Sequence, residues 1–331
     1  MTLNEFLEEW DSESSTITVH TSGSTGTPKS MQVEKIRMMN SARKTCDFLG
    51  LTRGDTALLC MPLDYIAGKM VVVRSIERGL RLIDVAPCGR PLEKLNEKID
   101  FAAMVPLQIK KSLANDEDRE KLKQIKQLII GGGAIDDDLS EELKDFPNNV
   151  WSTYGMTETL SHIAMRKING KERTEWYTPL KGIEIKLSER HTLAIKAPEI
   201  CEVEIETNDI AEINDKCQFR ILGRTDNTIN SGGVKIQIEE CERLIRDELN
   251  DKELKDKFRI SSRRHDLFGE EVVLVVTSDL SESDLEHIRE AYTKLPNKYW
   301  HPRDYIRLKE LPMTGNGKPD RAATKKIISQ S

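Results

Sequence analysis

The sequence predicts an α/β fold: a large N-terminal domain of layered sheets and helices that ends in a β-rich subdomain, followed by a small α+β domain. Before residue 182, short apolar runs alternate with segments of helical spacing, which is typical of a mainly parallel sheet covered by helices. From there to about residue 225, strand-like runs follow one another directly. We therefore expect domains at 1–225 and 226–331, with the β-rich subdomain at about 182–225.

The expected elements of the large domain follow the chain in order. Residues 34–49 have helical spacing and stop at Gly50, a residue suited to a left-handed helix C-cap. Pro106 is well placed to open another helix. A short polar helix is expected after the glycines at 131–133. Strands are expected at 16–20, 57–61, 80–86, 101–105, 128–130 and 150–152.

The expected elements change in character after residue 182. Residues 182–187 and 192–196 should form an antiparallel hairpin, and strands at 201–206 and 218–222 should continue the β-rich region. In the small domain we expect a helix at about 238–250 and strands near 257–262 and 271–277. A second helix should begin at Ser283, with Ser283 and Glu286 as its capping box.

Composition excludes several classes of protein. The 50 basic and 56 acidic residues give a net charge of −6 and are interspersed, so charge gives no reason to expect nucleic acid or membrane binding. Apolar runs such as 272–276 are too short to span a bilayer. The six cysteines include no CxxC pair, and the first residues lack the basic and apolar regions expected of a signal peptide. We therefore expect a cytoplasmic protein without disulfides or membrane insertion.

A loop rich in glycine and hydroxyl groups follows the first expected strand. Glycines let backbone N–H groups approach an anion, hydroxyls add donors, and Lys29 adds a positive charge. The loop therefore resembles a phosphate-binding loop, although its spacing departs from GxxxxGK[ST]. A flexible surface loop is the alternative, but it leaves the Pro-Lys ending unexplained. The residues before Pro28-Lys29 include Thr21, Ser22, Gly23, Ser24, Thr25 and Gly26.

Three further segments carry candidate chemistry. Tyr154, Thr157 and Glu158 follow an expected strand end, where α/β folds bind ligands. A tyrosine can stack on a purine, a threonine can bond a phosphate, and a glutamate can hold Mg²⁺. The alternative is a helix N-terminus capped by Thr157. Gly131, Gly132, Gly133 and Ala134 indicate a close backbone approach at another strand end, and Lys318 lies on a Gly-Asn-Gly-Lys turn, where a lone lysine is usually solvated.

In this order, the segments resemble the motifs of the adenylate-forming superfamily of acyl- and aryl-CoA synthetases, luciferases and adenylation domains. The resemblance runs from Thr21 to Arg321. It implies an acid–CoA ligase that uses ATP, Mg²⁺ and CoA and forms an acyl-adenylate before the thioester. It also implies that residues 21–30 cover the β- and γ-phosphates, that Gly131–Ala134 and Tyr154 enclose adenine, that Thr157 lies near the α-phosphate, and that Glu158 binds Mg²⁺.

The same resemblance implies roles in the C-terminal part of the chain. Asp209, in Thr207-Asn208-Asp209 where the family has a glycine at the second position, should hold the ribose together with Arg224. Asp226 matches the hinge of a mobile small domain. Lys318 matches the lysine that bridges carboxylate and α-phosphate during adenylation. The loop beside the pantetheine arm of CoA should contain Gly232, Gly233 and Lys235.

Residues 61–69 and 154–164 further resemble the o-succinylbenzoate–CoA ligases of menaquinone biosynthesis, although Asp64-Tyr65 replaces their aromatic-His pair. The implied acid is aromatic and dicarboxylic, and its unreactive ring carboxylate needs donors. Lys69, Ser161 and His162 are the candidates. Two alternatives stay open: an aryl-acid adenylating enzyme that loads a carrier protein, and a nucleotide-binding relative without ligase activity. Few residues precede Thr21, so we expect an N-terminally shortened fold. Either its sheet closes differently, for example in a homodimer, or it is a minimal version of the fold.

Overall fold

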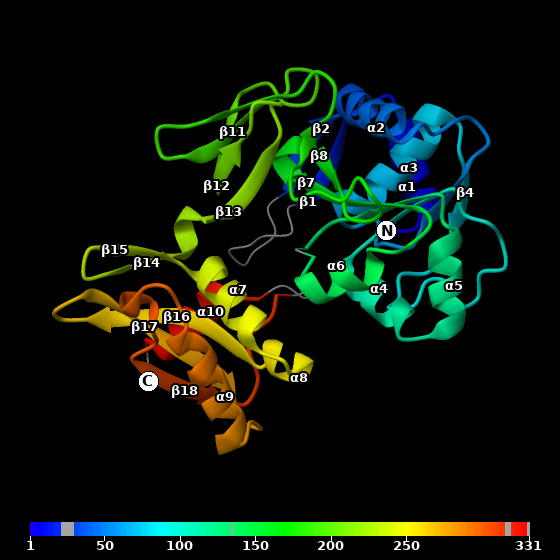
Figure 1. Ribbon diagram of the computed structural model, residues 1–331. Helices are drawn as coiled ribbons and strands as arrows, with labels where there is room; N and C mark the ends of the chain where they lie inside the picture. Colours follow the sequence, from blue (N-terminus) through cyan, green and yellow to red (C-terminus); the bar gives the residue numbers. More distant parts are fainter. Residues whose placement is uncertain (21–29, 134, 315–318, 330–331) are drawn as a thin grey trace. The chain divides into compact units, whose positions relative to one another are not determined.

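The computed structural model describes residues 1–20, 30–133, 135–314 and 319–329 (Figure 1). The chain divides into two compact units, which we describe separately. Unit 1 comprises Met1–Lys186, Ala194–Glu206 and Ile213–Arg220, and unit 2 comprises Leu187–Leu193, Thr207–Glu212 and Ile221–Ser331. The expected border at residues 225 and 226, and the hinge at Asp226, stay predictions.

The main sheet of unit 1 has the strand order β4-β3-β5-β6-β7-β8-β9 among the described residues. Neighbouring strands from β4 to β7 are parallel, whereas β8 and β9 run antiparallel to their neighbours. The parallel strands β3, β5 and β6 are buried at every residue, which explains their unbroken apolar runs. The mixed sheet and the helices along the chain confirm the α/β prediction. The bounds are β3 (Thr56–Leu59), β4 (Arg81–Asp84), β5 (Phe101–Met104), β6 (Gln127–Ile130), β7 (Asn149–Gly155), β8 (His162–Lys167) and β9 (Thr178–Pro179).

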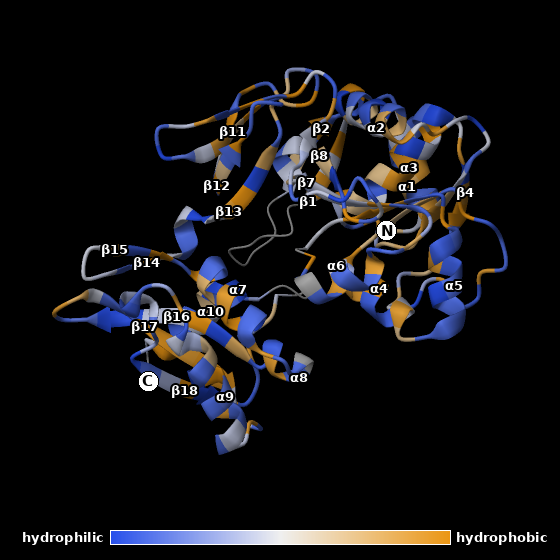
Figure 2. Ribbon diagram, viewed as in Figure 1, coloured by the Kyte–Doolittle hydropathy of each residue, from blue (hydrophilic) through white to orange (hydrophobic). Residues whose placement is uncertain are grey.

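Two helices of unit 1 begin or end at residues whose own backbone preferences favour a helix boundary. Helix α2 ends at Gly50, whose φ of 64° is left-handed as predicted, and α4 opens with Pro106. Helix α5 is almost entirely hydrophilic in Figure 2 and contributes Leu122 to the core. The bounds are α1 (Leu3–Asp11), α2 (Lys35–Leu49), α3 (Ile66–Arg78), α4 (Pro106–Leu113), α5 (Asp116–Gln124) and α6 (Asp137–Leu143).

Two smaller sheets complete the region before residue 225. Strands β1 (Thr16–His20) and β2 (Ser30–Glu34) form an antiparallel pair in which His20 is opposite Ser30. The other sheet has the order β10-β11-β12-β13, so the expected hairpin of β10 and β11 is present. The expected strand at 201–206 is wrong at its start, because Ile200 and Cys201 both donate to the Ala197 carbonyl in a turn. The bounds are β10 (Glu184–Leu187), β11 (Thr192–Lys196), β12 (Ile205–Ile213) and β13 (Phe219–Arg224).

Unit 2 contains a sheet of order β15-β14-β17-β16, with β18 parallel to β17. Helices α7 and α9 contribute Ile245 and Ile288 to its core. The predicted cap at Ser283 is wrong: Ser281 caps α9 and forms the capping box with Asp284. Nowhere in the described residues is a helix both long and apolar enough to cross a membrane. The bounds are β14 (Thr228–Ser231), β15 (Val234–Gln237), β16 (Phe258–His265), β17 (Gly269–Thr277), β18 (Asp304–Leu308), α7 (Ile238–Glu248), α8 (Lys252–Lys255), α9 (Glu282–Thr293) and α10 (Arg321–Ile328).

Candidate active site

The glycine segment and the tyrosine segment leave the main sheet at one edge. Strands β6 and β7 are adjacent and parallel, with Ile130 opposite Ser152, so Gly131 and Tyr154 both lie at their carboxyl ends. The Gly131 N–H donates to the Met104 carbonyl at 3.1 Å. A Cβ atom on Gly131 would lie 2.5 Å from Thr153 Oγ1, and Gly132 has a φ of 74°. The left-handed backbone therefore favours glycine at 132, and the Thr153 side chain leaves little room for a Cβ atom at 131, whatever binds there.

Aromatic packing orients Tyr154. Its ring makes a T-shaped contact with Phe219 at 5.0 Å between centroids and lies 5.9 Å from Tyr177. The Tyr177 hydroxyl lies 2.9 Å from Ser152 Oγ, which fixes that ring in turn. Tyr177 and Phe219 were not singled out from the sequence, because the bridge that pairs them joins segments far apart in the chain. Packing on this side restricts any purine to the remaining surface of Tyr154.

The turn after β7 is shaped by Thr159, a buried residue. Thr159 Oγ1 accepts the Met156 N–H at 3.0 Å and lies 2.7 Å from the Ser161 carbonyl oxygen. The short 3₁₀ helix η1 (Thr157–Thr159) starts at Thr157, with Met156 as its N-cap, so the alternative cap role for Thr157 is wrong. The Glu158 side chain is exposed here. A solvent-facing carboxylate suits a hard cation such as Mg²⁺, which would take further ligands from substrate phosphates and water.

A buried hydrogen-bond chain follows this turn. Arg74 of α3 is 2% exposed, and its Nη2 donates to Ser161 Oγ. Ser161 Oγ lies 3.3 Å from His162 Nδ1, and His162 Nε2 lies 2.9 Å from Thr45 Oγ1. Because the Thr45 hydroxyl donates to the Ser41 carbonyl, we assign the proton of His162 to Nε2. Burial, and then the charge of Arg74, hold the pKa of His162 well below its usual value.

Arg74 is a buried cation without a carboxylate partner in the part of the chain that the structure describes. Burial lowers its pKa to about 10, so it keeps its charge at neutral pH. Among the described residues no ion pair involves it, and its buried Nε atom finds no hydrogen-bond acceptor there. An uncompensated buried charge is costly, and a bound anion would offset the cost. Arg74 was not predicted from the sequence; the signal available was an arginine directly after the apolar residues 70–73 of α3.

Lys69 has a different setting from the one expected. Its side chain is 1% exposed, and Nζ donates to the Thr18 carbonyl of β1 at 2.8 Å. Nζ also lies 3.9 Å from Glu9 Oε2 and 5.5 Å from the Phe6 ring centroid. Burial lowers the pKa of Lys69. In the structure, Ser161 and His162 therefore lie with Arg74, whereas the Lys69 side chain contacts α1 and β1.

In unit 2, the structure brings together three predicted residues. Arg224 Nη1 donates to Asp209 Oδ1 at 2.8 Å, while Nε and Nη2 donate to the two carboxylate oxygens of Asp226 at 2.9 and 2.8 Å. The hydrogen bonds with Asp226, together with the charge of Asp209, raise the pKa of Arg224. The predicted ribose ligands and the predicted hinge are thus one charge network within this unit.

The expected pantetheine-side loop is the tip of the β14–β15 hairpin. Gly232 and Gly233 have φ values of 58° and 83°, which a two-residue hairpin turn requires. The Gly232 N–H donates to the Phe268 carbonyl at 2.9 Å, and Lys235 is exposed on β15. The hairpin itself was not predicted. The remaining predicted residues lie outside the described part of the chain: Thr21, Ser22, Gly23, Ser24, Thr25, Gly26, Lys29, Ala134 and Lys318.

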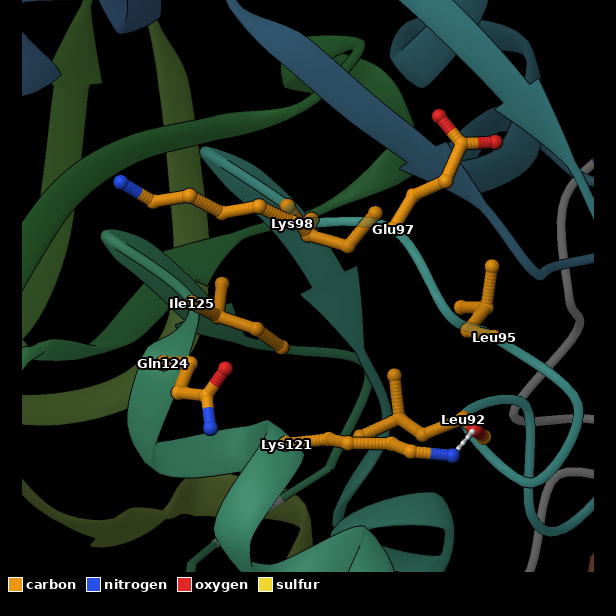
Figure 3. A pocket seen from close by; sticks show the side chains of 8 residues that line it. Leu92, Leu95, Glu97, Lys98, Lys121, Gln124 and Ile125 are labelled. Carbon is orange, nitrogen blue, oxygen red and sulfur yellow. Dashed lines mark hydrogen bonds between the residues drawn. The ribbon is translucent and has the colours of Figure 1, made fainter.

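Two hollows outside these groups do not compete as the site. The cavity in Figure 3, lined by residues such as Lys98 and Lys121, has a volume of about 20 Å³. That volume suits a single water molecule. The other, of about 350 Å³, lies in unit 2 beside Arg289 and Tyr305. No predicted site residue lines either one.

Comparisons with known proteins agree with the motif resemblance. The chain is 23% identical over 329 residues to the 2-succinylbenzoate–CoA ligase of Lactococcus lactis, covering 94% of this chain and 70% of that one. It is 29% identical to the enzyme of the same name from Salmonella typhimurium, covering 68% of this chain and 50% of that one. The chain thus spans about half to 70% of the length of these relatives.

A solved structure matches almost end to end. It is the crystal structure of an acyl-CoA synthetase (AMP-forming)/AMP-acid ligase II-like protein from Dyadobacter fermentans, 32% identical, with a TM-score of 0.66. The match covers 98% of this chain and 93% of that one. The family model of the AMP-binding enzymes matches residues 4–201. The chain therefore belongs to the AMP-binding enzymes, the adenylate-forming superfamily.

Proposed function

We propose that this protein is an ATP-dependent, AMP-forming acid–CoA ligase, and that its acid is 2-succinylbenzoate, a precursor of menaquinone. The observation that carries the proposal is the buried charge of Arg74 beside Ser161, which no carboxylate of the described residues pairs. These residues lie next to the turn that carries Thr157 and Glu158. The relatives that bear the name 2-succinylbenzoate–CoA ligase add support.

The acid end of the site is proposed around Arg74 rather than Lys69. A guanidinium held by Ser161, with its Nε unsatisfied, is suited to pair with a carboxylate. His162 uses both ring nitrogens within the protein, so its role is to orient Ser161. The ring carboxylate of 2-succinylbenzoate would then bind Arg74, leaving the succinyl carboxylate to react.

The nucleotide end of the site is proposed from the predicted motif residues. Tyr154 and the glycines 131–133 would hold adenine, Asp209 and Arg224 the ribose, and residues 21–30 the β- and γ-phosphates. Glu158 would hold Mg²⁺, whose charge neutralises phosphate oxygens when bound. Lys29 and Lys318 would add charge where the carboxylate meets the α-phosphate, since two anions must approach each other there.

The reaction has two steps. The acid carboxylate displaces pyrophosphate from ATP to give an acyl-adenylate, and the thiol of CoA then displaces AMP to give the thioester. Asp226 is proposed as the pivot that removes Lys318 between the steps and brings the loop with Gly232, Gly233 and Lys235 beside the thiol. Because Arg224 binds both Asp209 and Asp226, occupation of the ribose site would be sensed at that pivot.

The test is a panel of acids assayed for ATP-dependent pyrophosphate release, with and without CoA. We expect 2-succinylbenzoate to give the highest kcat/KM, and CoA to increase turnover and yield the thioester. Release with another acid alone would refute the substrate but not the chemistry. Acylation of a phosphopantetheinyl carrier protein in place of CoA would support the carrier-loading alternative. No pyrophosphate release with any acid would refute the ligase assignment.

A further inference from the structure

The β1–β2 hairpin carries residues 21–29 between its strands. His20, the last residue of β1, pairs with Ser30, the first residue of β2. An isolated two-stranded sheet is marginally stable without packing from elsewhere. One face of this hairpin is buried through Ile17, Val19 and Val33. Polar contacts along its outer edge add to what this packing fixes.

Both backbone groups of Thr18 on the outer edge of β1 are held by one ion pair. The Thr18 N–H donates to Glu9 Oε1 at 3.2 Å, and the Thr18 carbonyl accepts from Lys69 Nζ at 2.8 Å. Glu9 and Lys69 face each other at 3.9 Å. On the inner edge, Thr18 is paired with Gln32, whose Nε2 donates to Thr18 Oγ1 at 2.9 Å. Thr18 is therefore fixed from both sides, two residues before the end of β1.

We call the Glu9–Lys69 pair with its two bonds to Thr18 the clamp. Lys69 lies at a buried position, where a charged group is energetically unfavourable. Its side chain is 1% exposed, and burial lowers its pKa. The partners that offset the burial are the Thr18 carbonyl, Glu9 and the ring of Phe6, a fully buried residue of α1. An apolar side chain would fill the same space at lower cost. The charge of Lys69 therefore does more than fill space in the core. Among the described residues, the only backbone group to which Lys69 Nζ donates is the Thr18 carbonyl of the hairpin.

We infer that Lys69 and Glu9 are positioning residues for the phosphate loop: they fix the β1 edge so that residues 21–29 meet the phosphates of ATP. The inference rests on the proposed function, because it takes that loop as the phosphate site. Neither residue touches substrate in this role. Their effect should therefore appear in ATP binding and not in recognition of the acid.

The experiment compares the full-length variants Lys69→Met and Glu9→Gln with the wild type. Binding of a fluorescent ATP analogue, KM for ATP, KM for the acid, and hydrogen exchange of a peptide covering 16–34 are measured. Loss of a charge-assisted hydrogen bond corresponds to at least about a tenfold change. For Lys69→Met we expect about that increase in both Kd and KM for ATP, less than a twofold change in KM for the acid, and faster exchange in 16–34.

A matched control is available in the same unit. Lys167 is also buried, with its Nζ 4.3 Å from the Trp151 ring centroid and bonded to Asn149. Lys167→Met removes a buried lysine without touching the hairpin. We expect it to lower the unfolding temperature while leaving KM for ATP and exchange in 16–34 unchanged.

The outcomes separate the two proposals. A wild type that does not bind ATP would refute the proposed function and this inference with it. A wild type that binds ATP, beside a folded Lys69→Met variant with unchanged ATP affinity and exchange, would refute the inference alone. Should Lys69→Met fail to fold, Glu9→Gln decides, because Glu9 is one-third exposed and its amide can still accept from Thr18. An increase of about threefold in KM for ATP supports the clamp, and no change overturns it.

Discussion

Replacing Arg74 by methionine tests the proposed acid site most directly. Methionine keeps the length and apolar packing of the side chain but removes the guanidinium. The folded protein loses the bond from Nη2 to Ser161 Oγ, and it is also relieved of an unpaired buried charge. A charge-assisted hydrogen bond is worth about 1.5–3 kcal/mol. Replacing buried charges by apolar groups often returns about 1–4 kcal/mol. The two contributions nearly cancel, so we expect the unliganded variant to unfold within a few degrees of the wild type.

The effect on substrate use should be much larger. A ring carboxylate that loses its charged partner in a buried site forfeits about 1.5–3 kcal/mol, which is about a 10- to 150-fold loss in kcat/KM for 2-succinylbenzoate. 4-Phenyl-4-oxobutanoate has the same reactive arm and no ring carboxylate. It should be a poor substrate for the wild type, and the substitution should change its kcat/KM little. The assay is initial-rate pyrophosphate release at varied acid and saturating ATP.

One control variant, Arg259→Met, makes the result interpretable. Arg259 is another buried arginine with an unsatisfied Nε, but it lies in unit 2 and donates to the Phe258 carbonyl. Arg259→Met should leave the ratio of kcat/KM for the two acids as it is in the wild type. The reasoning is refuted if Arg74→Met lowers kcat/KM for both acids equally, since Arg74 would then act only through the fold. Equal use of both acids by the wild type would refute the substrate.

Three other groups of side chains carry separate predictions. His162 is held neutral, so below its unfolded pKa of about 6.5 the unfolded state alone takes up a proton, and stability should fall by up to about 1.4 kcal/mol per pH unit. Urea unfolding at pH 7.5 and 5.5 should show less of this loss in His162→Gln; an equal loss would contradict the assignment. Lys318→Ala should nearly abolish acyl-adenylate formation but spare thioester formation from supplied acyl-adenylate; equal loss in both half-reactions would argue against domain alternation. Cys88 and Cys217 are exposed and should react with a thiol reagent before the other four cysteines, which are buried; in a C88S/C217S variant the rapid phase should vanish.

Local signals in the sequence determined much of the fold. The alternation of apolar runs with helical spacing is a backbone and burial property, so the parallel strands β3, β5 and β6 could be located from it. Gly50 and Pro106 act through their own φ angles, which explains why both helix ends were predicted correctly. Ser281 and Ser283 compete for one cap within three residues, and composition alone could not choose between them.

In the candidate site, too, some features could be predicted from local sequence and others could not. Each motif is a continuous stretch of sequence, so the motifs and their order along the chain were enough to indicate the superfamily. The roles of Lys69 and Arg74 were not, although both lie on α3. Lys69 finds its acceptor 51 residues away, on Thr18, and Arg74 finds Ser161 87 residues away. Helical periodicity shows that a residue faces inward, but not what it meets there. Only the tertiary structure decided that one buried cation bonds to the Thr18 carbonyl of β1, while the other faces Ser161 without a carboxylate partner among the described residues.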